Sequence, residues 1–518
     1  MISDVVSTTA GRIRGAGDGA VSAFKGVPYG DDTGGTGRFR PPRPPQPWSG
    51  VRDCIAYGPS CPQMTILQML GVAPPPEAET YMGVLNAEPS TGEDCLALNV
   101  WTPAPDPAAR LPVLVWLHGG GWSTGSASWP LYDFTNLARN HGVVVVGVNH
   151  RVGILGFLDV SGLDDAYADS GNVGMLDIVA ALGWIRANIG DFGGDPGNVT
   201  VFGESGGGAK TSTLLAMPAA TGLFHKAYDM SGVAVTVQTR DAAAANSAAV
   251  LDALGIGRDG IGDLQGISAE RLIEAEVALP GRAPSVLDRG RGFSPVLGPS
   301  LPQHPVEALR AGASADVVLV TGCTTDEVLA FLASDPDLWN LTDDGLRRRL
   351  HTLLGDITDT IIERYRALHP DDSPAALLVA IATDAVFRLP HVRQAEAKAV
   401  GGGQPAYLYA FAFGHPDPTG RTRAMHGLDM PYFFDNVDVA PIAAGPHAPR
   451  LVAAMSGSLA ALAHTGRPDH EGLPAWTPYR PDSRATMCFD VESTMVTDLL
   501  GPERACWDGI DITGLSHR

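Results

Sequence analysis

Residues 199–208 read Val-Thr-Val-Phe-Gly-Glu-Ser-Gly-Gly-Gly and join a buried strand to a sharp turn. The first four are β-branched or aromatic, which is typical of a strand, and the run stops at Gly203. The five residues from Gly203 to Gly207 have the spacing G-x-S-x-G of a strand-to-helix turn that exposes a serine hydroxyl. We therefore predict that Ser205 is a nucleophile. The alternative is a serine in an ordinary glycine-rich turn.

Segments typical of strands alternate with helical ones along the chain. Residues 209–216 are expected to form a helix whose N-terminal amides face an anion at Ser205. A second helix is expected over 172–188, with an apolar face made of Val173, Leu176, Val179, Ala180 and Trp184. Further strands are expected at 23–29 (an edge strand), 94–101, 112–117, 143–148, 226–230, 317–321 and 406–411. The alternation predicts an α/β fold with a large, mostly parallel central sheet and helices on both faces.

The 518 residues (1–518) are expected to form a single domain with inserted segments. Residues 62–90 are irregular and polar, whereas 233–315 and 330–400 hold helical stretches that interrupt the succession of strands. Insertions at the ends of sheet strands commonly form pockets and lids. We therefore expect these three segments to cover the functional site.

Composition argues against several classes of protein. The formal net charge of −21 and the sequence pI of about 5.0 disfavour binding to nucleic acid or to an anionic membrane. Six cysteines are too few for a disulfide scaffold in so long a chain, and no spacing suggests metal ligands. The first residues lack the pattern of a secretory signal, and no apolar run approaches the roughly 20 residues of a membrane span. We expect a cytoplasmic protein without metal or cofactor; the oligomeric state stays open.

A glycine-rich loop follows the expected strand at 112–117. Its sequence, from His118 to Trp122, contains three consecutive glycines, which leave peptide N–H groups free to point into a cavity. An oxyanion hole is built in this way. His118 is a catalytic candidate, but a histidine beside such a loop more often orients the backbone, and we prefer that interpretation.

A nucleophilic serine needs a histidine base and a carboxylate that orients the imidazole. Asp326 and Glu327 both follow the strand at 317–321, and either could face the histidine or simply cap the next helix. His415 and His426 both follow the strand at 406–411. His415 suits a solvent-facing turn, and His426 lies at the edge of an apolar segment. The residues alone leave both choices open.

The order of the motifs resembles the type-B carboxylesterases, the branch of the α/β-hydrolase superfamily that includes para-nitrobenzyl esterases and cholinesterases. The resemblance covers nearly the whole chain and implies the α/β-hydrolase fold, with helical insertions over the active site. The motifs that carry it are Phe-Lys-Gly-Val-Pro-Tyr at 24–29, Arg-Phe at 38–39, Trp-Ser-Gly-Val at 48–51, Glu-Asp-Cys-Leu at 93–96, 118–122, Asn-His-Arg at 149–151, Gly-Phe-Leu at 156–158, 192–198 and 203–207.

The resemblance also assigns roles to individual residues. It makes Ser205 the nucleophile, Glu327 the acid and His426 the base. It places the oxyanion hole at the amides of Gly120, Gly121 and Gly206, and it places Ser231 and Glu204 beside the triad. Cys61 and Cys95 match positions that are disulfide-bonded in secreted relatives, although a reducing cytoplasm disfavours that bond.

Three residues depart from the family pattern. Ala97 stands where tyrosine or threonine is usual, and Asp429 where glutamate is usual. Val328 stands where a glycine usually follows the acid, which affects the expected backbone around Glu327. No departure removes a catalytic group.

The resemblance implies a serine hydrolase of small-molecule carboxylic esters that works through an acyl-enzyme. A carbamate or amide hydrolase, a lactonase or an acyltransferase would use the same triad. A non-catalytic binding protein on the same scaffold is a further alternative.

Overall fold

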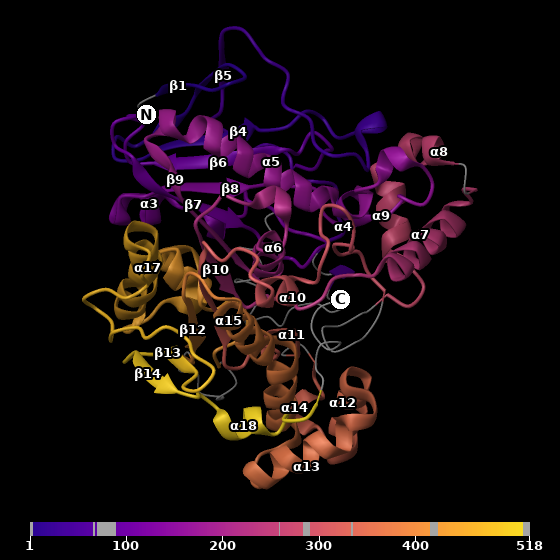
Figure 1. The fold of residues 1–518 in the computed structure, drawn as a ribbon, viewed down its shortest axis with the longest axis vertical. Helices are drawn as coiled ribbons and strands as arrows, with labels where there is room; N and C mark the ends of the chain where they lie inside the picture. Colours follow the sequence, from indigo (N-terminus) through magenta and orange to yellow (C-terminus); the bar gives the residue numbers. More distant parts are fainter. Residues whose placement is uncertain are drawn as a thin grey trace.

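The computed structural model describes residues 4–65, 68–69, 90–257, 260–282, 291–332, 335–414 and 423–510. Within them, an eleven-stranded sheet has the order β14-β13-β12-β11-β10-β9-β7-β8-β6-β4-β3 (Figure 1). Its strands are β3 Ala16–Gly17, β4 Ser22–Pro28, β6 Ala97–Thr102, β7 Leu111–Leu117, β8 Val144–Val148, β9 Gly194–Glu204, β10 Lys226–Met230, β11 Val318–Thr324, β12 Ala406–Phe411, β13 Ala485–Phe489 and β14 Thr494–Thr497. A separate small sheet contains β1 Val5–Ser7, β2 Arg12–Arg14 and β5 Val51–Asp53.

The seven consecutive strands β8, β7, β9, β10, β11, β12 and β13 are parallel to one another. The outer pairs, β13–β14 at one end and β8–β6, β6–β4 and β4–β3 at the other, are antiparallel. The predicted mostly parallel sheet is therefore confirmed. The expected edge strand is wrong in one respect, because the two-residue β3 forms the edge and β4 lies one position inside it. Strands β13 and β14 have no counterpart among the expected strands.

The central strand β7 shows why the sheet is buried on both faces. Its successive side chains point to opposite faces. Leu114 and Trp116 join one hydrophobic cluster, whereas Val113, Val115 and Leu117 join the other. Two cores therefore sandwich the sheet, and each needs its own layer of helices.

Helices cover both cores, as predicted. The core around Trp116 includes residues of α3 Thr135–His141, α11 Leu329–Leu332, α12 Asp343–Leu354, α13 Thr358–Leu368, α14 Pro374–Thr383, α16 Met430–Phe433 and α17 Ala448–Thr465. The other core includes residues of α4 Gly153–Phe157, α5 Val173–Asn188, α6 Gly206–Leu214, α7 Arg240–Leu254, α8 Ile261–Gly266, α9 Ala269–Val277 and α10 Pro305–Arg310. A π-helical turn at Asp384–Arg388 joins α14 to α15 Leu389–Gly401, and α18 Gly501–Ala505 follows β14. In Figure 1, α12 and α13 form the lower end of the molecule.

The predicted helix at 172–188 is present as α5, but only part of its expected apolar face is buried, namely Val173 and Trp184. Leu176, Val179 and Ala180 are only partly buried, whereas Ile178 and Ile185 are completely buried. The helix is apolar nearly all round, so its sequence does not show which side meets the sheet.

Two helical stretches, Asp165–Phe192 and Pro374–Gly401, are apolar and long enough to cross a membrane by length and composition alone. A search for unbroken apolar runs does not find these stretches, because charged residues such as Asp177 interrupt them. In their most apolar windows, 61% and 83% of the residues are buried inside the protein, so packing against the core accounts for their composition.

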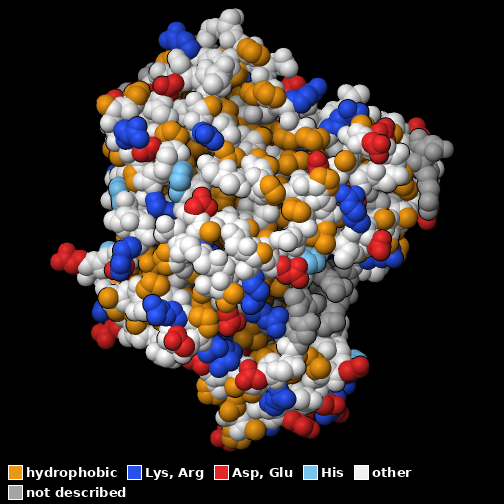
Figure 2. All heavy atoms as spheres, viewed as in Figure 1, with side chains coloured by type: hydrophobic (Ala, Val, Ile, Leu, Met, Phe, Trp, Pro, Cys, Tyr) orange, Lys and Arg blue, Asp and Glu red, His pale blue; other side chains and the backbone are white. Residues whose placement is uncertain are grey.

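Acidic and basic side chains are interspersed over the face shown in Figure 2.

Candidate active site

Ser205 occupies a strained turn between β9 and α6. Its backbone has φ 56° and ψ −122°, a conformation that non-glycine residues rarely adopt. A β-carbon at Gly207 would overlap the carbonyl oxygen of Leu117, and one at Gly203 would overlap the backbone of Gly207. Glycine is therefore required at both positions. The predicted helix is present and begins at Gly206, directly after the serine.

The glycine loop after β7 packs against the start of α6. Gly120 and Gly121 have φ values of 89° and 59°, in the region that favours glycine. A β-carbon at Gly206 would overlap the carbonyl oxygen of Gly121, so these two backbones touch. The structure thus brings together the loop and the helix that carry the three expected oxyanion-hole amides.

His118, the residue before the three glycines, contacts the backbone of this loop. Its Nδ1 lies 2.9 Å from the carbonyl oxygen of Gly119, and its ring stacks on that of His150 at 4.6 Å. Burial lowers the pKa of His118 to about 3, so the ring is neutral and Nδ1–H is the donor. These contacts favour the orienting role over a catalytic one.

Glu327 is held in place by two hydrogen bonds on one carboxylate oxygen. Ser231 Oγ donates to Oε1 at 2.6 Å, and the backbone N–H of Thr324, the last residue of β11, donates to the same atom at 2.7 Å. The other oxygen, Oε2, is hydrogen-bonded to Nδ1 of His426. Asp326 instead forms an ion pair with Arg423 at 3.3 Å. The two adjacent acids therefore have different partners: Glu327 contacts His426, and Asp326 contacts Arg423.

His426 lies between two carboxylates. Its Nε2 is 3.2 Å from Oε1 of Glu204, the residue that precedes the serine. Burial lowers the pKa of His426, but the carboxylates of Glu204 and Glu327 outweigh burial and raise it to about 9. Burial raises the pKa of Glu204 itself to about 8. The alternative base, His415, lies outside the described residues.

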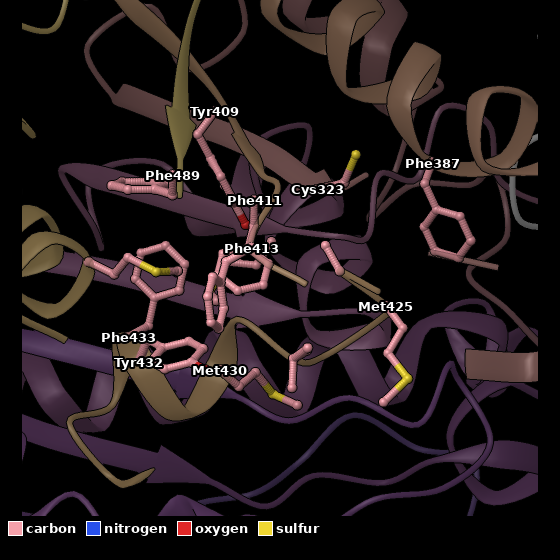
Figure 3. Close-up of a cluster of buried hydrophobic side chains, with 14 of the residues drawn as sticks. Cys323, Phe387, Tyr409, Phe411, Phe413, Met425, Met430, Tyr432, Phe433 and Phe489 are labelled. Atoms are coloured by element: carbon pink, nitrogen blue, oxygen red, sulfur yellow. The ribbon is translucent and has the colours of Figure 1, made fainter. Parts of the chain in front are cut away.

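Two phenylalanine rings lie near the imidazole of His426. The rings of Phe331 and Phe387 lie 5.0 and 5.2 Å from it. In Figure 3, Phe387 stands apart from the cluster that contains Phe433 and Phe489. Phe387 belongs to the π-helical turn at Asp384–Arg388, a type of distortion that often occurs at functional sites.

Two departures from the family pattern lie close to the triad. Val328 has no positive φ and is completely buried, so the backbone after Glu327 does not require glycine. Asp429 is also buried, and Tyr409 donates a 3.1 Å hydrogen bond to it.

Cys61 and Cys95 are buried free thiols in this structure.

Ser205 opens onto a cavity of about 180 Å³. The described residues that line it include Gly121 and Gly206, the apolar side chains Met64, Met69, Trp122, Ala209, Leu279 and Phe293, and the charged side chains Glu276, Arg282 and Arg291. The segments 62–90 and 233–315 therefore contribute to the lining, although residues 66–67 and 70–89 lie outside the described part of the chain. The segment 330–400 contributes aromatic rings beside His426 instead.

Glu276 and Lys210 lie near the nucleophile without a role predicted from the sequence. Glu276 accepts a 2.9 Å hydrogen bond from the backbone N–H of Ile154, and burial raises its pKa to about 7. Lys210 is completely buried in α6. The chain contains only four lysines. A lysine among the small residues that follow the nucleophile was the one sequence signal that could have indicated a role for Lys210.

Comparison with known proteins gives consistent matches over almost the whole chain. The sequence profile described as the carboxylesterase family matches residues 2–507. The chain is 37% identical to para-nitrobenzyl esterase of Bacillus subtilis (strain 168), covering 96% of this chain and 97% of that protein. It is 33% identical to phenmedipham hydrolase of Pseudarthrobacter oxydans, with coverages of 96% and 98%. The solved carboxylesterase of Geobacillus stearothermophilus superposes with a TM-score of 0.83 at 35% identity, covering 97% of this chain and 99% of that one.

Proposed function

The chain belongs to the carboxylesterase family and is a hydrolase of carboxylic esters, and we propose that it cleaves them through an acyl-enzyme on Ser205. In this proposal His426 is the base and Glu327 is the acid that orients it. The amides of Gly120, Gly121 and Gly206 form the oxyanion hole.

In the first half-reaction, Ser205 Oγ attacks the ester carbonyl carbon while its proton passes to Nε2 of His426. Glu327 keeps Nδ1 protonated, so that Nε2 is the basic nitrogen, and it stabilises the imidazolium that forms. The carbonyl oxygen becomes an oxyanion facing the three amides. Each such donor contributes roughly 2.7 to 4 kcal/mol of transition-state stabilisation in known cases.

Collapse of this intermediate breaks the bond to the alcohol, which leaves with the proton from His426. In the second half-reaction, a water molecule attacks the acyl carbon and gives its proton to His426. The carboxylic acid leaves, and the proton returns from His426 to Ser205 Oγ. The observation that supports this assignment best is the hydrogen-bonded series from Ser231 through Glu327 to His426, whose Nε2 lies 3.2 Å from Oε1 of Glu204, the residue before Ser205.

The proposal is tested by replacing the nucleophile. Ser205→Ala is expected to abolish hydrolysis of a short-acyl p-nitrophenyl ester, and an organophosphate should label the wild-type peptide that contains Ser205. Ser212→Ala is a matched control on the same helix, since its hydroxyl donates to the carbonyl of Ala234 instead. Full hydrolysis by Ser205→Ala would overturn the assignment.

The substrate class is tested separately, because carbamates, amides and lactones present the same type of carbonyl group. Rates on matched ester, carbamate, amide and lactone substrates are measured, with and without a competing alcohol. We propose that the ester is the fastest of these and that water is the preferred acceptor. Absence of both turnover and organophosphate labelling would favour a non-catalytic binding protein.

A further inference from the structure

Lys210 lies on the face of α6 that meets the glycine loop. It follows Gly206 by four residues, so the two lie on the same side of the helix. Gly206 brings its backbone against Gly121, and Lys210 extends toward the same loop one turn further along. The helix that follows the nucleophile therefore carries a lysine that reaches the glycine loop.

The ammonium of Lys210 binds two carbonyl groups of this loop. Its Nζ donates to the carbonyl oxygen of Gly121 at 2.9 Å and to that of His118 at 3.1 Å. These carbonyls lie on either side of the N–H groups of Gly120 and Gly121 in the chain. Holding both carbonyls fixes the two peptide groups between them.

The position of Lys210 is costly for stability. The residue is completely buried, and no carboxylate forms an ion pair with it in the described part of the chain. A cation near a helix N-terminus is also unfavourable, because the helix dipole is positive there. Its contacts are two carbonyl oxygens and the ring of Trp122, whose centroid is 5.7 Å away. The contacts that explain a lysine at this site are its two hydrogen bonds to the glycine loop.

We propose that Lys210 is a positioning residue for the oxyanion hole, which clamps the glycine loop through two hydrogen bonds and so holds the amides of Gly120 and Gly121 in place. This inference rests on the proposed acyl-enzyme mechanism. Lys210 acts through the loop, since its ammonium is bound to backbone carbonyls and is not among the residues that line the cavity.

The charge on Lys210 changes within an accessible pH range. Burial lowers its pKa to about 7. In the described part of the chain, the titratable groups coupled to it are His118, directly after β7, and His150, after β8, and burial keeps both neutral by lowering their pKa values. As pH rises through the pKa of Lys210, the clamp keeps N–H donors but loses its charge.

The first test compares Lys210→Met with Lys398→Met. Lys398 is a matched control, because its Nζ also binds two backbone carbonyls, those of Ser314 at 2.7 Å and Ala315 at 3.2 Å, away from the site. We expect Lys210→Met to lower kcat by about 10- to 100-fold, with KM changed less than about threefold. Its affinity for a short alkyl trifluoromethyl ketone, which forms a tetrahedral adduct on a serine, should fall by a similar factor. Equal kcat values in the two variants would overturn the proposal.

The second test uses Lys210→Gln, which keeps an N–H donor without the charge and replaces Lys210→Met if that variant does not fold. At the pH at which His426 is neutral, kcat of Lys210→Gln should lie between that of the wild type and that of Lys210→Met, since the shorter amide keeps an N–H donor but cannot hold both carbonyls as the lysine does. A Lys210→Gln variant with the wild-type kcat would overturn the role of the clamp. If Ser205→Ala is inactive and both Lys210 variants keep full kcat, only this inference fails; if Ser205→Ala is active, the proposed function fails.

Discussion

Nε2 of His426 lies 3.2 Å from Oε1 of Glu204, while Nδ1 of the same ring is hydrogen-bonded to Glu327. Two carboxylates therefore act on one imidazole from opposite sides. Together they raise the pKa of His426 to about 9, against the opposing effect of burial. In the proposed mechanism the neutral imidazole is the active form, so this pair sets the pH at which hydrolysis begins.

Glu204→Gln is expected to move the acid limb of the profile of kcat/KM against pH to lower pH by about 1 to 2 units. Removing a negative charge beside Nε2 destabilises the imidazolium and lowers the pKa of His426, so the neutral base persists at lower pH. Initial rates on a p-nitrophenyl ester across the pH range measure the shift. Asp326→Asn, which removes the carboxylate paired with Arg423, should leave the limb in place. An unmoved limb in Glu204→Gln would contradict the prediction.

Glu327→Gln is expected to lower kcat by about 10³- to 10⁴-fold, because an amide in place of the carboxylate stabilises the wrong imidazole tautomer and not the imidazolium. The neighbouring Asp326→Asn should keep most of its kcat, since Asp326 faces Arg423 and not His426. Steady-state kinetics of the two variants side by side decide between adjacent acids. Equal losses would show that the geometry around Glu327 does not carry the reaction.

Ser231→Ala is expected to lower kcat by about 10-fold, with little change in KM. It removes the 2.6 Å hydrogen bond to Oε1 of Glu327 and leaves the N–H of Thr324 as the remaining donor to that oxygen. A hydrogen bond to a charged group contributes about 1.5 to 3 kcal/mol, and part of it is recovered by relaxation. Ser212→Ala, which removes another buried hydroxyl, controls for loss of stability. Unchanged kcat in Ser231→Ala would mean that Thr324 alone holds the acid.

The strands that follow strong local patterns were predicted well. The bounds of β10 and β12 match the expected ones, and a turn-forming residue lies directly at one end of each strand, Ser231 after β10 and Pro405 before β12. Strand β14 was missed, since Thr494–Thr497 is exposed or only partly buried and therefore lacks a clear apolar pattern. The nucleophile turn was predicted because its glycines are required by contacts within a few residues and with the adjacent β7.

The contacts that organise the site join distant parts of the chain, and local pattern does not reveal them. The choice between Asp326 and Glu327 depends on where His426 lies, and the residues alone left it open. The contact between Glu204 and His426 and the clamp formed by Lys210 depend on the same tertiary packing. Sequence motifs therefore predict the kinds of group at this site, whereas their pKa values come from packing.

Stability away from the site is expected to depend on a buried ion pair. Arg151 donates to Asp177 through its backbone N–H at 3.0 Å, through Nε at 2.8 Å and through a terminal nitrogen at 2.6 Å. Both side chains are almost fully buried, so Asp177→Asn leaves a buried guanidinium without its counter-charge. We expect the free energy of unfolding, measured with urea, to fall by about 3 to 5 kcal/mol. Asp359→Asn, which breaks the exposed pair with Arg347, should change it by no more than about 1 kcal/mol. The double variant Arg151→Met/Asp177→Leu should recover much of this lost stability, because no charge then stays buried. If the double variant is destabilised as much as Asp177→Asn, the ion pair itself is needed for folding.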